Sequence, residues 1–130
     1  MLYPLTALAT LAMVAVYVWT MAMLGPARRK HGVKAPATSG SDEFNRVYRA
    51  HMNTQEQLTA MLPVVWVFAL TFADRWAALL ALVWIVGRIL YVQGYIASAD
   101  KRGTGFMIGF IAMAIGLLGS AGMILWNLFR

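Results

Sequence analysis

The chain has 130 residues, of which 61% are hydrophobic and only 12% are charged. This balance excludes a water-soluble domain, because a chain this short buries too little of its surface to hide so many apolar side chains. The sequence contains no cysteine, which excludes disulfides, thiolate metal ligands and a thiol nucleophile supplied by the protein. The formal net charge of +6 would suggest nucleic acid in a polar protein. In a membrane protein, the positive charge has to be interpreted from where the basic residues lie relative to the membrane spans.

Four apolar segments predict four membrane-spanning helices, at about residues 3–27, 44–73, 76–97 and 104–128. Basic residues follow the first segment rather than precede it, so we expect an uncleaved helix and not a signal peptide. The second helix follows a loop rich in glycine and proline, with Ser41 as the expected N-cap, and only its second half is apolar. The sequence therefore predicts one domain, residues 1–130, that folds as an all-α integral membrane four-helix bundle.

The basic residues gather on one side of the predicted membrane. The first and third loops and the helix ends beside them hold Arg28, Arg29, Lys30, Lys34, Arg46, Arg49, Lys101 and Arg102. The opposite side holds Arg75 and Arg130. The positive-inside rule then predicts that loops 1 and 3 face the cytoplasm. This orientation accounts for the charge without nucleic acid. We expect a bacterial inner membrane, or the endoplasmic reticulum if the source is eukaryotic.

Two helices carry polar residues three or four positions apart, a spacing that places them on one helix face. The second helix has Arg46, Arg49, Asn53 and Glu56, and the third continues through Arg88, Tyr91, Tyr95, Ser98 and Arg102. Arg88 lies deep in an apolar segment, where a charge facing lipid costs about 2.5–3.5 kcal/mol. We therefore expect it at an interior site, with a structural ion pair to Glu56 as the alternative. Arginines, one carboxylate, an amide and two phenols together suit a zwitterionic, peptide-like ligand.

Two runs carry a resemblance to a known family. The run FNRVYRAHMNTQE at residues 44–56, followed by GRILYVQGY at residues 87–95, closely resembles the MAPEG family, the membrane-associated proteins in eicosanoid and glutathione metabolism. In particular it is similar to the branch of microsomal glutathione transferase 2 and leukotriene C synthase. The resemblance holds in register from about residue 28 to residue 102. His51 and Gln57 depart from the family pattern, which has glutamine and tyrosine there.

The resemblance implies a homotrimer of four-helix protomers that binds glutathione between subunits, near the cytoplasmic side. From one subunit it implies the glutathione ligands Arg49, Asn53, Glu56, Arg88, Tyr91 and Tyr95. From the neighbouring subunit it implies Arg28 and the position of His51. Arg102 matches the arginine that stabilises the glutathione thiolate, and Arg29 matches a second arginine that assists the electrophile.

The expected function is that of a membrane-bound glutathione transferase in detoxification. It would conjugate glutathione to lipophilic electrophiles, with glutathione-dependent peroxidase activity on lipid hydroperoxides as a related reaction. Glutathione would be a co-substrate, and we expect no tightly bound cofactor and no metal. The expected partners are membrane lipid and further copies of the chain. The alternative is a non-catalytic lipid-binding protein of the same fold. A four-span exporter fits the size but needs a carboxylate in an early span, and the first span has none.

Overall fold

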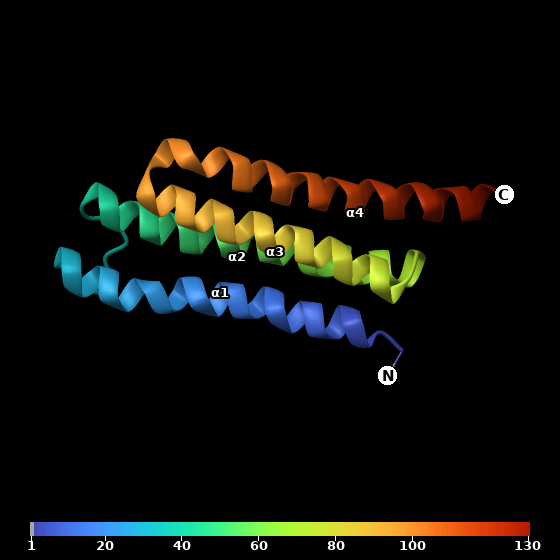
Figure 1. Ribbon diagram of the computed structural model, residues 1–130, viewed down its shortest axis with the longest axis horizontal. Helices are drawn as coiled ribbons and strands as arrows, with labels where there is room; N and C mark the ends of the chain where they lie inside the picture. The colour runs from blue at the N-terminus through green and yellow to red at the C-terminus, as the bar shows by residue number, and fades with distance from the viewer. Residues whose placement is uncertain (1) are drawn as a thin grey trace.

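The computed structural model describes residues 2–130 and consists of four long helices that run up and down beside one another (Figure 1). In chain order these are α1 (Pro4–His31), α2 (Asp42–Thr71), α3 (Asp74–Ala97) and α4 (Gly103–Phe129), with a 3₁₀ turn η1 (Ala99–Arg102) before α4. The described residues contain no strand. The predicted all-α helix bundle is confirmed.

Local chemistry sets the helix ends. Ser41 accepts a hydrogen bond from the backbone amide three residues later, which confirms it as the N-cap of α2. At the end of α1, Gly32 adopts φ 66°, a left-handed conformation that costs glycine little. The start of α1 is capped from another helix. The Asp74 carboxylate accepts hydrogen bonds from the amides of Leu5 (3.0 Å) and Thr6 (2.7 Å).

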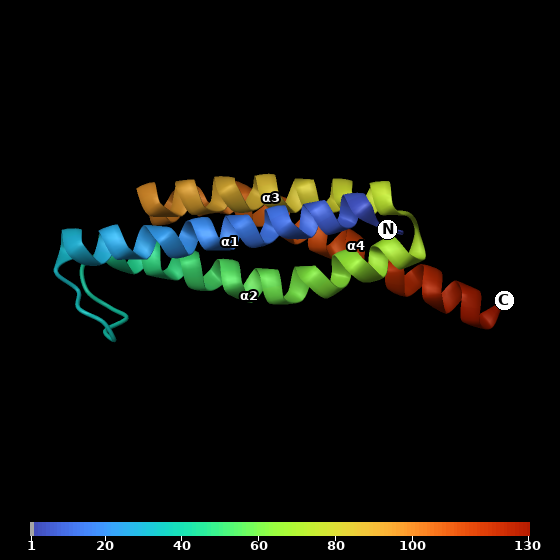
Figure 2. The ribbon, with the colours of Figure 1, turned by 90° about the horizontal axis from the view of Figure 1, so that it is seen from below.

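The helices α2 and α3 form the middle of the bundle. Figures 1 and 2 show α1 on one side of this pair and α4 on the other. The side chains of Met13, Met61 and Trp84, from α1, α2 and α3, are fully buried in the core. Each of the two central helices contacts both outer helices.

The contact between α3 and α4 is unusually close. The buried residues of α4 are all small, and they are Gly105, Gly109, Ala112, Gly116 and Ser120. A Cβ atom added at Gly87 of α3 would lie 2.7 Å from the backbone nitrogen of Gly109. Such small residues let helix backbones approach in a membrane. This contact holds the start of α4, and thus Arg102, against the end of α3.

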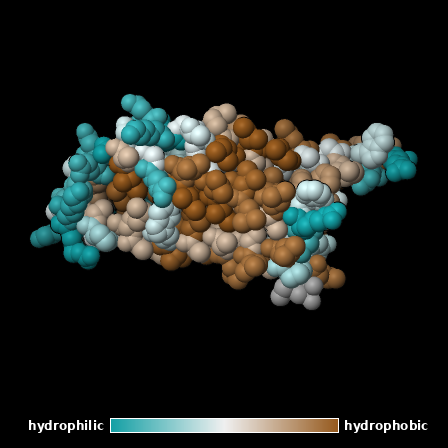
Figure 3. All heavy atoms as spheres, in the orientation of Figure 1, coloured by the Kyte–Doolittle hydropathy of each residue, from teal (hydrophilic) through white to brown (hydrophobic). Residues whose placement is uncertain are grey.

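Three helical segments are long and apolar enough to cross a membrane: Pro4–His31, Asp74–Ala97 and Ala99–Phe129. The helix α2 is not among them, in keeping with its polar first half. Figure 3 shows hydrophobic residues across the middle of one face and hydrophilic residues toward its two ends. Large apolar side chains are exposed on both outer helices, such as Leu8 of α1 and Leu118 of α4. A bilayer is the solvent that this surface requires.

Candidate functional site

A polar cavity of about 240 Å³ lies where α2, α3 and the start of α4 meet. Each of these elements contributes side chains to its lining. The lining residues are Arg49, Asn53, Tyr91, Tyr95, Arg102, Gly103 and Phe106. Residues from the polar stripes of α2 and α3 therefore meet at this cavity. Residues 2–130 contain no cluster of histidines and carboxylates that could hold a metal ion.

A row of hydrogen bonds and one ion pair joins four of the predicted site residues. The Arg88 Nη1 donates to Asn53 Oδ1 at 2.8 Å, and Asn53 Nδ2 donates to Glu56 Oε2 at 3.1 Å. The other carboxylate oxygen of Glu56 lies 3.6 Å from Arg49 Nη1. Asn53 thus stands between Arg88 and Glu56. The direct ion pair between those two residues, the alternative from the sequence, does not form within the described chain.

Arg88 faces the interior of the bundle, as predicted. Its side chain is fully enclosed, with 1% exposure. The guanidinium lies 4.1 Å from the centroid of the Tyr91 ring, whose π-face favours a cation. Its Nε has no hydrogen-bond partner among residues 2–130. Since a buried charge is costly without partners, the amide of Asn53 and the Tyr91 ring are what stabilise it here.

The rim of the cavity is formed by Arg102 and two tyrosines. Arg102 lies at the junction of η1 and α4, is exposed, and has its guanidinium carbon 5.1 Å from the centroid of the Tyr95 ring. The rings of Tyr91 and Tyr95 lie 5.6 Å apart. The cavity therefore presents an accessible cation beside two phenols, whereas the buried Arg88 does not line it and is joined to it through Asn53.

Five predicted site residues do not line the cavity of their own chain. Glu56 and Arg88 are joined to it through Asn53, and the other three lie away from it. Arg28 donates to the carbonyl of Ala37 (2.8 Å) and so holds the loop between α1 and α2. Arg29 is exposed near the end of α1. His51 is buried against α1, with Nδ1 3.0 Å from Thr20 Oγ1. Within one chain, none of these three residues can contact a molecule in the cavity.

Two residues that the sequence analysis did not single out line the cavity, and one residue of the α2 stripe does not line it. Gly103 and Phe106 line the cavity. Phe106 lies four residues after Arg102, so helical periodicity could have found it. Arg46 belongs to the α2 stripe by spacing, but its Nε donates to the carbonyl of Ile96 at the end of α3 (3.1 Å). It lines a different cavity.

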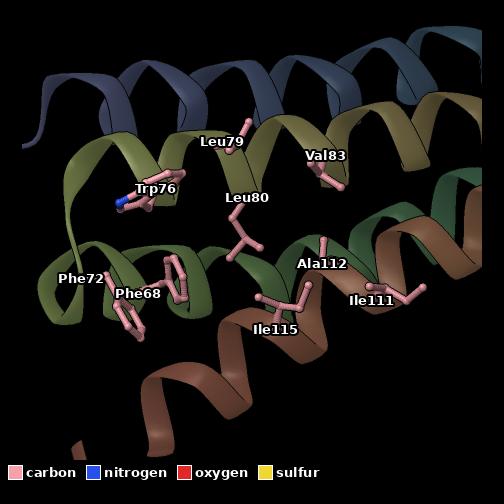
Figure 4. Close-up of a pocket in the computed structure, with 9 residues that line it drawn as sticks. All are labelled: Phe68, Phe72, Trp76, Leu79, Leu80, Val83, Ile111, Ala112 and Ile115. Carbon is pink, nitrogen blue, oxygen red and sulfur yellow. The ribbon is translucent and has the colours of Figure 1, made fainter. Parts of the chain in front are cut away.

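An apolar pocket of about 420 Å³ lies near the opposite end of the bundle (Figure 4). Aromatic side chains at the turn between α2 and α3 form one end of it, and aliphatic side chains of α3 and α4 form the rest. The lining residues are Phe68, Phe72, Trp76, Leu79, Leu80, Val83, Ile111, Ala112 and Ile115. None of these side chains can transfer a proton or hold a charge. This pocket can therefore hold only an apolar molecule or group.

These features define a helical membrane protein with a polar site enclosed by three of its helices. The sequence model of the MAPEG family matches residues 6–122, and the chain belongs to this family. It is 44% identical to an uncharacterized protein of Synechocystis sp. over 124 residues, which cover 95% of this chain and 88% of that protein. It is 41% identical to human microsomal glutathione S-transferase 2 over 101 residues, or 77% and 69% of the two chains. Bovine leukotriene C4 synthase is 42% identical over 76 residues, which span 58% of this chain and about half (51%) of the synthase.

Proposed function

We propose that this protein is a membrane-bound glutathione transferase that activates glutathione as a thiolate and conjugates it to lipophilic electrophiles. The observation that supports this most is the joined row Arg88–Asn53–Glu56–Arg49, of which Asn53 and Arg49 line the cavity together with two tyrosines and Arg102. Glutathione carries two carboxylates, an ammonium group and a thiol. The arginines offer paired donors for the carboxylates, and Glu56 offers an acceptor for the ammonium group.

The proposal includes a second subunit at the site, and the trimer implied by the family resemblance would supply it. The cavity of about 240 Å³ is smaller than the roughly 300–1,000 Å³ usual for small-molecule sites. Arg28 and Arg29, at the end of α1, do not reach the cavity of their own chain. A neighbouring copy could bring its own α1 end to this cavity. The site lies at the end of the bundle that holds the basic loops, which we assign to the cytoplasmic side.

In the proposed mechanism Arg102 favours the thiolate over the thiol of bound glutathione. A unit charge pair about 4 Å apart gains roughly 4 kcal/mol at an effective dielectric of 20. Arg102 is exposed, so water screens much of this, and a drop of about one unit in the thiol pKa remains. From a thiol pKa of about 8.5, that raises the thiolate fraction at pH 7 from about 3% to about a quarter. The thiolate sulfur then forms a bond to the electrophilic carbon, and the leaving group departs with the electron pair.

The electrophile would reach the sulfur from the bilayer. Phe106 lines the cavity, and Phe110, one turn further along α4, is 53% exposed. Apolar walls of this kind distinguish substrates by only about 1–3 kcal/mol per methylene. We therefore propose a class of substrate, lipophilic electrophiles, with lipid hydroperoxides as a further class for the same bound thiolate.

Thiolate absorbance on mixing with glutathione tests this function. The wild-type protein should show a thiolate signal at neutral pH, and Arg102→Ala should lose most of it while still binding glutathione in calorimetry. Lys101→Ala is the matched control, because it removes an exposed neighbouring cation that does not line the cavity. Equal signals from wild type and Arg102→Ala would refute the assignment of Arg102.

The alternative function, non-catalytic lipid binding, predicts a different pattern. The purified protein would then give no heat with glutathione and form no conjugate with a model aryl halide. The buried Arg88 and its bond to Asn53 disfavour this alternative, because a purely lipid-binding protein gains nothing from a charge enclosed beside a polar cavity.

A further inference from the structure

A second polar cavity, of about 490 Å³, lies between the end of α1, the start of α2 and the end of α3. It shares no lining residue with the candidate glutathione site. Its polar lining consists of Lys30, His31, Glu43 and Arg46, and the rest is aliphatic. Figure 3 shows hydrophilic residues gathered at this end of the bundle, next to the hydrophobic band. The cavity therefore opens at the level where lipid headgroups meet their acyl chains.

The charges in this cavity are arranged to hold an anion. Glu43 Oε2 lies 3.7 Å from Lys30 Nζ and 3.5 Å from His31 Nε2, and with Lys30 and Arg46 against this one carboxylate the lining carries a net positive charge. The Nε of Arg46 donates to the carbonyl of Ile96 (3.1 Å), which fixes the orientation of its guanidinium. Its two terminal nitrogens have no hydrogen-bond or ion-pair partner among residues 2–130. A fixed guanidinium with free paired donors fits a phosphate group.

An apolar groove lies on the same side of α1 as this cationic cavity. This groove of about 310 Å³ runs between α1 and α3 and is lined by Ala12, Ala15, Val16, Trp19 and Ile89. Trp19 precedes Pro26 of the cationic cavity by seven residues, a spacing that returns to the same helix face about 10 Å further along. The cationic cavity and the apolar groove are thus placed like the headgroup and the acyl chain of one lipid.

We infer that this face binds an anionic glycerophospholipid, with the phosphate in the cavity at Arg46 and Lys30 and one acyl chain in the groove beside Trp19. Basic pockets between membrane helices are typical binding sites of such headgroups. An acyl chain would cover apolar surface that the bundle leaves open at the groove. The lipid site stands independently of the proposed glutathione chemistry, because the two cavities are separate.

Native mass spectrometry of the purified protein tests this inference. The protein is exchanged into a neutral detergent with a mixture of phosphatidylglycerol and phosphatidylcholine, and bound lipid is counted. The variant Lys30→Gln/Arg46→Gln should bind phosphatidylglycerol about thirtyfold more weakly than wild type, because two basic residues at about 1 kcal/mol each contribute about 2 kcal/mol. Lys34→Gln is the matched control, because it removes an exposed cation in the adjacent loop that lines neither cavity.

A third variant distinguishes a lipid from a free anion. Ala15→Phe fills the groove and leaves the cationic cavity intact, so it should also reduce phosphatidylglycerol retention, whereas added inorganic phosphate should not displace the lipid. The inference is overturned if the double variant retains as much phosphatidylglycerol as wild type, or if Lys34→Gln loses as much as the double variant. It is overturned equally if phosphate displaces the lipid and Ala15→Phe has no effect. Circular dichroism and the elution volume check that each variant is folded.

Discussion

Replacing Asn53 by alanine tests the polar row at its central point. The change removes the acceptor that Arg88 Nη1 uses at 2.8 Å. A hydrogen bond to a charged group contributes about 1.5–3 kcal/mol. Because Arg88 is only 1% exposed, water cannot readily replace the lost acceptor. The bond from Asn53 to the half-exposed Glu56 adds little. We therefore expect the free energy of unfolding to fall by about 2–3 kcal/mol.

The assay is denaturant unfolding in one detergent, followed by circular dichroism. Gln55→Ala is the matched control, since Gln55 is exposed on the same helix, and it should change stability by less than about 0.5 kcal/mol. In the Asn53→Ala background, Arg88→Met should recover part of the loss, because no unpaired buried charge then remains. If Asn53→Ala is as stable as Gln55→Ala, or if the second substitution only adds to the loss, the reasoning about Arg88 is wrong.

Two further substitutions test how the helices are held together. Asp74→Asn weakens the cap at the start of α1 and should lower the unfolding midpoint in the same assay, whereas Asp100→Asn, in an exposed turn, should leave it unchanged. Stability unchanged in both variants would show that this cap contributes nothing. Gly105→Ala places a Cβ against the backbone of Tyr91 and should destabilise the protein by about 1–3 kcal/mol. Gly122→Ala, which meets no neighbour, should be neutral or stabilising, and equal effects at the two glycines would contradict the close helix contact.

Helical periodicity predicted which side chains of α2 and α3 share a face, and the pairing of Asn53 with Arg88 agrees with it. The same periodicity placed Arg46 on this face, yet its side chain turns to the end of α3. A long flexible side chain at the edge of a stripe can reach either neighbouring groove. Which groove offers an acceptor depends on where the next helix ends, and spacing along one helix carries no such information.

The sequence by itself determined the four helices, their apolar character and the angular position of each polar residue, because these follow from hydropathy and a period of 3.6 residues. The tertiary structure decided the contacts. It put the Asn53 amide between Arg88 and Glu56, buried His51 against Thr20 of α1, and separated two cationic cavities at one end of the bundle. The physical reason is that contacts depend on the distance and rotation between helices. Here the distance and rotation between α3 and α4 are set largely by small residues such as Gly105. Because these residues have no large side chain, the backbone of α4 can lie directly against α3.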